Sequence, residues 1–61
     1  MDHLPLNDVP MLVSSINFLL RDGEYDDLDQ ICYSFDVERS EVDGILASQG
    51  YAYDAERNRV I

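Results

Sequence analysis

Several residue types that build structural or catalytic centres are scarce in this 61-residue chain. It has one cysteine, Cys32, one histidine, His3, and no lysine. One cysteine excludes an intrachain disulfide, and one thiol with one imidazole cannot supply the four ligands of a structural zinc site. An unpaired thiol is typical of a reducing compartment. We therefore expect a cytoplasmic protein that folds without a disulfide, a metal or a cofactor.

Segments that would direct the chain to a membrane are also missing from the sequence. No apolar run approaches the roughly 20 residues of a transmembrane helix. Asp2 stands where a signal peptide carries positive charge. There is no glycine-rich phosphate loop and no Ser/His/Asp set. Three short helices would also leave little room for a cleft of a few hundred Å³. We expect neither membrane association nor enzymatic activity.

Positive charge is scarce as well. The chain has 13 acidic residues against four arginines, and its formal net charge is −9. Nucleic-acid binding depends on basic side chains that neutralise phosphates, and anionic membrane surfaces repel an acidic domain. The charge therefore favours a protein partner, basic in character, or a second copy of the chain, over nucleic acid or membrane.

What is present is sufficient for one small domain spanning residues 1–61. Hydrophobic residues make up 46% of the chain, which argues against disorder. A domain of this size buries only about 60% of the surface that its unfolded chain exposes, so its stability is expected to be marginal. Self-association is one route to additional stability.

Apolar residues recur at helical spacing in three stretches, which predict helices at about 9–22, 27–35 and 38–49. Asp8 is a candidate N-cap with Pro10 in the first turn, and Gly23 and Gly50 are natural stops. The predicted inner faces are Leu12, Val13, Ile16, Leu19 and Leu20 in the first stretch, Leu28, Ile31, Cys32 and Phe35 in the second, and Val42, Ile45 and Leu46 in the third.

The two ends of the chain have a different character. Residues 1–7 are interpreted as a lead-in, and residues 51–61 predict a short β-hairpin whose turn lies between Asp54 and Asn58. Val37 is expected to tuck inward at the turn between the second and third helices. The predicted fold is mainly α, a three-helix bundle of helix-turn-helix type with a short C-terminal β-hairpin, which is winged-helix-like.

Short motifs along nearly the whole chain resemble a family of short bacterial proteins, classified only as a domain of unknown function and numbered 4250 in that series. The family pattern places proline directly after the first aspartate, whereas here Val9 stands between Asp8 and Pro10. The resemblance implies a bacterial source and a self-contained domain, and it implies no activity. The matching pieces are Met11-Leu12, Ser14, Asn17, Leu20-Arg21-Asp22, Leu28-Asp29, Ile31-Cys32, Gly50-Tyr51, Tyr53-Asp54 and Asn58.

Two features invite a chemical interpretation. Cys32 could be a nucleophile, but its acidic surroundings and its place on an apolar helix face favour a buried core residue. A cluster of acids, in which Gly23 falls at the second position rather than the sixth, has the wrong spacing for an EF-hand. We interpret the cluster as a solvated loop with helix-capping charges. Its members are Asp22, Glu24, Asp26, Asp27 and Asp29.

The helix-turn-helix layout raises nucleic-acid binding as an alternative function. The residues of the third helix expected to face outward are Arg39, Ser40, Asp43, Gly44 and Ala47, with Glu38 and Glu41 beside them. A helix surface with one arginine and three acids is poorly suited to contact DNA. A positive groove formed by Arg39, Arg57 and Arg59 would favour this alternative.

Large side chains outside the predicted core faces are candidates for a protein contact. They are Met11, Phe18, Tyr25 and Tyr33. Tyrosine, phenylalanine and methionine are enriched at interfaces, although a small protein can also wrap such residues around its own core. Asn17 is predicted to fix the chain that follows the third helix through buried hydrogen bonds.

These observations predict a non-enzymatic interaction or adaptor module with an apolar patch rimmed by carboxylates. The alternatives are a winged helix-turn-helix nucleic-acid binder and an acidic nucleic-acid mimic, whose carboxylates would occupy the phosphate site of a DNA-binding protein.

Overall fold

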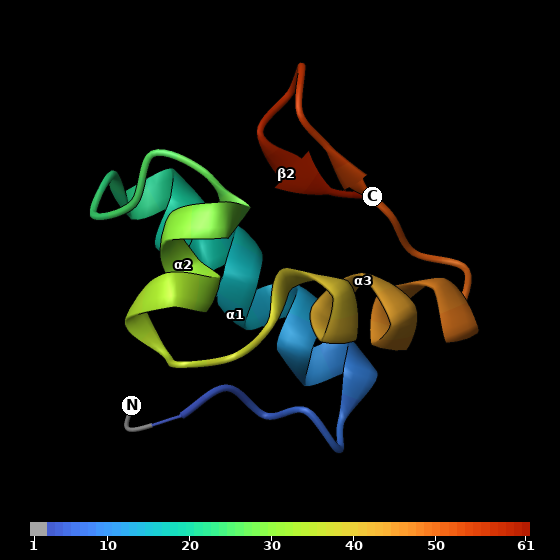
Figure 1. Ribbon diagram of the computed structural model, residues 1–61. Helices are drawn as coiled ribbons and strands as arrows, with labels where there is room; N and C mark the ends of the chain where they lie inside the picture. Colours follow the sequence, from blue (N-terminus) through green and yellow to red (C-terminus); the bar gives the residue numbers. More distant parts are fainter. Residues whose placement is uncertain (1–2) are drawn as a thin grey trace.

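The computed structural model describes residues 3–61 as three helices followed by a β-hairpin (Figure 1). Helix α1 spans Val9–Asp22, α2 spans Leu28–Ser34 and α3 spans Arg39–Ser48. The hairpin strands are short, β1 being Tyr53–Asp54 and β2 Arg59–Val60. The mainly α class with a C-terminal hairpin is confirmed. Each end of each helix lies within one residue of the predicted position.

Helix α1 begins at the cap that the sequence indicates. The Asp8 backbone is extended, and its Oδ1 accepts a hydrogen bond from the Met11 backbone nitrogen at 3.2 Å. Pro10 lies in the first turn, where a missing N–H breaks no helical hydrogen bond. The inserted Val9 thus leaves Asp8 as the cap. At the other end, Gly23 takes a φ of 82°, and its backbone nitrogen donates to the Leu20 carbonyl.

The core draws on all three helices and also on both ends of the described chain. Leu4 is 4% exposed and Val60 is 2% exposed, although neither belongs to a predicted core face. The segment expected to be only a lead-in therefore contributes a core side chain. The other buried hydrophobic residues are Leu12, Ile16 and Leu20 of α1, Leu28, Ile31 and Cys32 of α2, and Val42 and Leu46 of α3.

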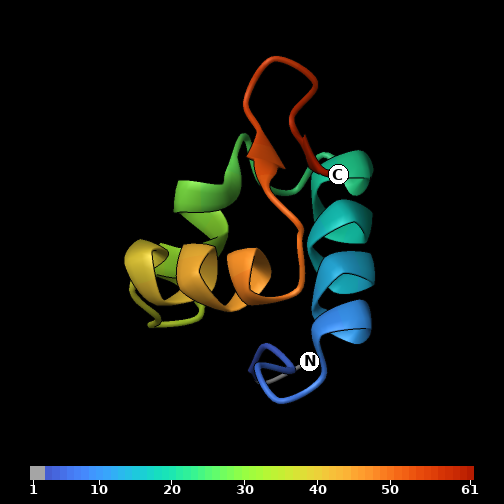
Figure 2. The same cartoon turned by 90° about the vertical axis from the view of Figure 1, so that its right-hand side faces the viewer.

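Helices α2 and α3 are joined by a tight turn, as in a helix-turn-helix unit. Asp36 adopts a positive φ of 56°, and the Val37 backbone nitrogen then donates to the Cys32 carbonyl at 3.0 Å. This hydrogen bond turns Val37 inward, where it packs half-buried against the core as predicted. Helix α3 consequently runs across the direction of α1 (Figure 2).

The hairpin lies beside the C-terminal half of α1 (Figures 1 and 2). Its strands are antiparallel, with Tyr53 opposite Val60 and Asp54 opposite Arg59. Asn17 of α1 attaches the hairpin, because its side-chain amide donates to the Val60 carbonyl at 3.0 Å and accepts from the Val60 nitrogen at 2.7 Å. The predicted role of Asn17 is confirmed.

Candidate interaction surface

Cys32 is a core residue, as its position on the apolar face of α2 predicts. Its side chain is buried, and desolvation by that burial raises the thiol pKa above its ordinary value. The Arg39 charge opposes this rise in pKa, while Asp29 and Asp43 add to it. The thiol is therefore held in its protonated, unreactive form.

Part of the acid cluster at residues 22–29 has structural roles, while Asp22 and Glu24 are exposed. Asp27 caps α2, its Oδ1 accepting from the Gln30 nitrogen at 3.0 Å. Gln30 in turn accepts from the Asp26 nitrogen through its Oε1, at 3.1 Å. Asp29 pairs with an arginine of α3. Within residues 3–61, no group of three or more His, Cys, Asp or Glu side chains is placed to hold a metal ion.

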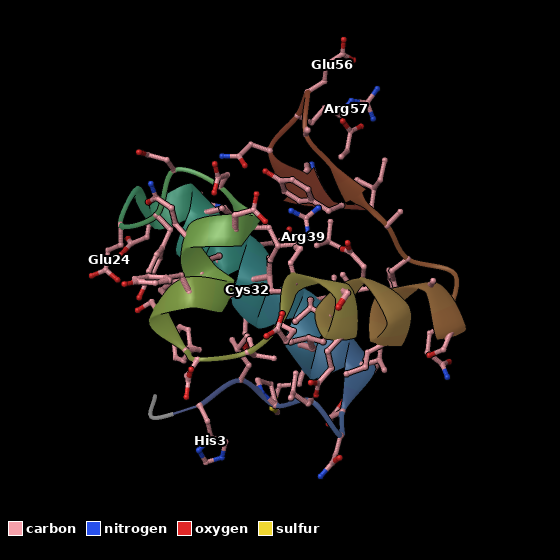
Figure 3. All side chains as sticks on the ribbon, in the orientation of Figure 1. His3, Glu24, Cys32, Arg39, Glu56 and Arg57 are labelled. Carbon is pink, nitrogen blue, oxygen red and sulfur yellow. The ribbon has the colours of Figure 1, made fainter. Side chains whose placement is uncertain are left out.

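Arg39 turns toward α2 and the hairpin instead of facing outward from α3 (Figure 3). Its Nη1 lies 2.7 Å from Asp29 Oδ1 and its Nε lies 3.0 Å from Asp43 Oδ1. Its guanidinium carbon also stands 5.0 Å from the centre of the Tyr53 ring. Desolvation lowers the pKa of Arg39, but the hydrogen bonds to Asp29 and Asp43 outweigh it and raise that pKa overall.

The expectation of an outward Arg39 is therefore wrong. Its guanidinium has two carboxylates and an aromatic ring within reach, and these hold it against the molecule. The other residues expected on the outer face of α3 are exposed, and none of them is basic: Ser40, Asp43, Gly44 and Ala47.

The four predicted contact residues do not form one cluster. Tyr33 is 90% exposed, Phe18 61% and Met11 55%. Tyr25 is only half-buried, since its ring packs against Phe35 at a centroid distance of 6.4 Å. Tyr25 and Tyr33 line one hollow of the surface, and Phe18 lines a different one on α1.

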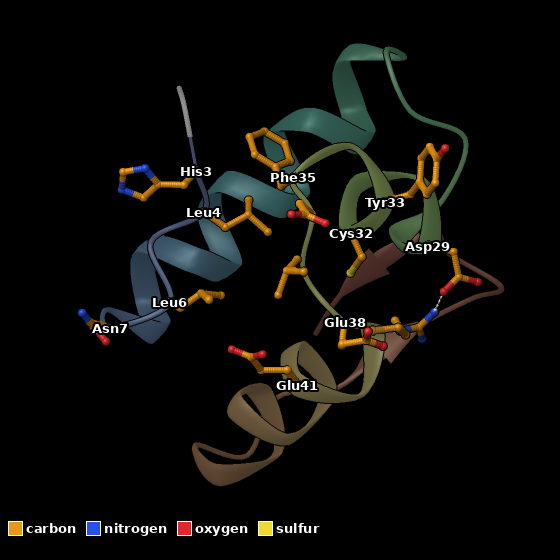
Figure 4. A pocket seen from close by; sticks show the side chains of 13 residues that line it. His3, Leu4, Leu6, Asn7, Asp29, Cys32, Tyr33, Phe35, Glu38 and Glu41 are labelled. Atoms are coloured by element: carbon orange, nitrogen blue, oxygen red, sulfur yellow. Dashed lines mark hydrogen bonds and ion pairs between the residues drawn. The ribbon is translucent and has the colours of Figure 1, made fainter.

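A larger open hollow, of about 760 Å³, lies between the N-terminal segment, α2 and the start of α3 (Figure 4). Leu4 and Leu6 point into it from the N-terminal segment, opposite Cys32. We call it the acidic groove. Its apolar lining is Leu4, Leu6, Cys32, Phe35 and Val37, and its acidic lining is Asp29, Asp36, Glu38 and Glu41.

The hollow is larger than the little room expected between three short helices. The helices alone do not form it. Leu4 is buried against the core, so the N-terminal segment runs back along the α2–α3 turn and becomes the second wall of a trough.

Tyr33 marks the boundary between this groove and a second hollow. The second hollow, of about 470 Å³, is lined by Tyr33, Tyr25 and Gln30 together with the carboxylates of Glu24, Asp27 and Asp29. Tyr33 and Asp29 line both hollows. We call the two hollows together the acidic face. An almost fully exposed aromatic ring therefore stands among carboxylates on both sides.

Three arginines gather elsewhere on the molecule. Arg21, Arg57 and Arg59 line a hollow of about 300 Å³ between the end of α1 and the hairpin. This arginine hollow differs from the predicted positive groove, because Arg39 is paired with acids and Arg21 takes its place. Figure 3 shows Arg57 at the hairpin tip and Glu24 on another side of the molecule, near α2.

The helix lengths and the comparisons with known proteins bear on what the protein is. No helix among residues 3–61 combines the length and the apolar character needed to cross a membrane. Comparison of the chain with curated proteins and with solved structures finds no match. A family model described as a domain of unknown function (DUF4250) matches residues 6–60. The chain therefore belongs to the DUF4250 family.

Proposed function

We propose that this protein is a non-enzymatic interaction module that binds a basic segment of another protein in the acidic groove. One observation carries the proposal: the apolar lining of the groove is bordered by carboxylates and by the exposed ring of Tyr33. This combination matches the chemistry of lysine and arginine side chains. Their aliphatic stems can cover apolar surface while their charged ends stay at the rim.

The negative charge of the rim is available to a partner. Asp36, Glu38 and Glu41 have no cationic group within 4.0 Å among residues 3–61, and the nearby Arg39 is committed to Asp29 and Asp43. Arg39 also lines the groove, but four carboxylates outnumber it, and an excess of charge of one sign speeds association with a partner of opposite charge. The interaction is accordingly expected to weaken as salt rises.

Tyr33 is the side chain best placed to supply binding energy. Its ring makes little contact with the rest of the chain and is 90% exposed. Tyrosine is enriched among residues that dominate binding energy, and its ring face attracts lysine and arginine cations. Tyr25, fixed by Phe35 and by a hydroxyl contact of 3.2 Å with Ser34, would form a firm wall beside it.

The winged-helix alternative receives less support from the position of the charges. In that binding mode α3 would enter the major groove of DNA, and its exposed residues would contact bases and phosphates. The exposed side chains of α3 include Glu41 and Asp43, while its one arginine is paired with acids. The acidic-mimic alternative uses the same carboxylates, but it does not account for the apolar groove lining or for the exposed ring of Tyr33.

A reducing location accords with this proposal. Cys32 is a free thiol in the core, and oxidation would place a polar group among apolar neighbours. We therefore propose that the module acts in the cytoplasm.

Affinity capture from a bacterial lysate tests the proposal. The tagged protein should retain basic proteins at low salt and release them at moderate salt, whereas Tyr33→Ala should retain far less. Met11→Ala is the matched control, since Met11 is exposed on α1 outside the acidic face. Loss of capture by competing duplex DNA, with no effect of Tyr33→Ala, would instead favour the acidic mimic.

A further inference from the structure

The arginine hollow lies outside the acidic face and plays no part in the proposed protein contact. It gathers three of the four arginines of a chain that has a net charge of −9. Arg21 comes from the last turn of α1, Arg57 from the hairpin turn and Arg59 from β2. Asn17 and Asn58 line the same hollow.

Hydrogen bonds hold the two walls of the hollow against each other. Asn17 binds both backbone polar groups of Val60, which joins α1 to the strand that carries Arg59. Asn58 donates from its Nδ2 to the Asp26 carbonyl at 2.9 Å and accepts from the Tyr53 hydroxyl. The hairpin is therefore attached on both sides. Three arginines from distant parts of the chain are brought to one place by a fixed backbone.

The charges in this hollow are largely uncompensated. Arg57 has one carboxylate nearby, with Asp54 Oδ2 at 3.9 Å from its Nε. In the part of the chain that the structure describes, Arg21 and Arg59 have no carboxylate within 4.0 Å. Arg39, in contrast, reaches a carboxylate oxygen at 2.7 Å. Arg21 and Arg59 thus lie together with Arg57, whose carboxylate partner is 3.9 Å away, in a chain that has 13 acids.

We propose that the arginine hollow binds the phosphate group of a small phosphorylated molecule. The planar guanidinium group forms paired hydrogen bonds with phosphate oxygens, and several such groups around one hollow suit a divalent anion. The amides of Asn17 and Asn58 each already use their oxygen and one N–H within the fold, so the guanidinium groups would be the main donors. A hollow of about 300 Å³ admits a phosphate with a small substituent. The net charge of −9 disfavours a long polyanion.

Inorganic phosphate is the probe for a direct test by NMR. Phosphate is titrated into the full chain at constant pH and ionic strength, with chloride as the balancing anion. The proposal expects saturable shifts of the Arg21 and Arg59 side-chain Nε–H signals and of hairpin amides, with little change at Arg39. A response that does not saturate, or that is as large at Arg39, would overturn the proposal.

Single substitutions then separate a specific site from general charge attraction. Arg21→Gln and Arg59→Gln should each weaken phosphate binding about tenfold, the effect of losing a hydrogen bond to a charged group. Arg59→Lys keeps the charge but loses the paired donors. Its phosphate affinity should lie between that of Arg59→Gln and that of the wild type. Glu41→Gln makes the net charge less negative on a different face and should leave phosphate affinity unchanged.

Equal weakening of phosphate binding in Arg59→Gln and Arg59→Lys would also support the proposal, since both variants lose the paired N–H donors of the guanidinium group. Unchanged phosphate affinity in Arg21→Gln and Arg59→Gln, with melting temperatures close to the wild type, would refute it. A duplex oligonucleotide forms the second arm. If the duplex binds at physiological salt through the same arginines and more tightly than phosphate, the small-molecule assignment is wrong.

Discussion

Asn17 on α1 hydrogen-bonds to both backbone polar groups of Val60 on β2, which is 43 residues further along the chain. Val60 faces Tyr53 in the hairpin, while the next pair, Ala52 and Ile61, exchanges both hydrogen bonds at 2.9 Å. Positions alternate along an antiparallel ladder, so the N–H and C=O of Val60 point away from β1. The amide of Asn17 therefore binds the two polar groups of Val60 that a third strand would otherwise bind.

Replacing Asn17 should release the hairpin from α1. Asn17→Ala leaves both Val60 groups without their partner in a half-buried site, so we expect a loss of about 1–3 kcal/mol in the free energy of unfolding. Asn17→Asp should lose at least as much, because a carboxylate then faces the Val60 carbonyl. Urea denaturation measures both effects. Ser14→Ala, an exposed change on the same helix, is the control and should stay within about 0.5 kcal/mol of wild type.

Arg39 should act as a link between α2, α3 and the hairpin. Arg39→Gln removes the hydrogen bonds to Asp29 and Asp43 and the contact with the Tyr53 ring. The site is partly exposed, so we expect a loss of only about 1–2 kcal/mol, smaller at high salt. Arg39→Lys should recover part of the lost stability, because lysine keeps the charge but lacks the paired N–H donors of the guanidinium group. Equal melting temperatures for wild type and Arg39→Gln at low salt would contradict this account.

Cys32 should make stability depend on pH in alkaline solution. Burial raises the thiol pKa in the folded state, so the folded protein holds the proton more tightly than the unfolded chain. This contribution is complete below the unfolded thiol pKa of about 8.5 and is lost as pH rises toward the folded value. Wild type should therefore lose stability faster than Cys32→Ala as pH rises above about 8.5.

Comparing the slopes of unfolding free energy against pH isolates the thiol, because the four tyrosines of the chain titrate in both proteins. Alkylation offers a second readout. Iodoacetamide at pH 8 should modify native Cys32 far more slowly than the denatured chain. Equally fast alkylation of the native and denatured protein would show that Cys32 is accessible.

Tyr33 should be dispensable for folding. Its side chain is 90% exposed, so Tyr33→Ala should change the unfolding free energy by no more than about 0.5 kcal/mol, as measured by urea denaturation. A loss of more than about 2 kcal/mol in the unfolding free energy would mean that the ring packs within the fold and is not exposed for a partner. The variant is therefore suitable for testing function separately from stability.

Local chemistry was enough to predict the helices and the role of Asn17. Asp8 and Gly23 mark the ends of α1 through their capping chemistry, and the apolar faces of α2 and α3 follow from 3.6-residue periodicity. Asn17 interrupts an otherwise apolar region of a helix, and such an amide needs a partner. Each of these signals depends on residues close together in the sequence.

The acidic groove and the position of Arg39 could not be predicted in the same way. Leu4 sits in a short segment with no periodicity, so its return to the core carries no local signal. Arg39 lies at an outward position of α3 by helical count, but its long side chain reaches Asp29 of α2 at 2.7 Å. The arginine hollow likewise depends on how the hairpin folds back onto α1. All three features arise from contacts between distant segments.

Photo-crosslinking in living cells that produce the protein tests the proposed contact surface most directly. A benzophenone amino acid is introduced at position 33, and a matched chain carries it in place of Ala47, an exposed residue on the outer face of α3. We predict an adduct with a basic protein from position 33 and none from position 47. Adducts from position 47 alone, or an adduct of position 33 with nucleic acid, would contradict the assignment of the acidic face as a protein-binding surface.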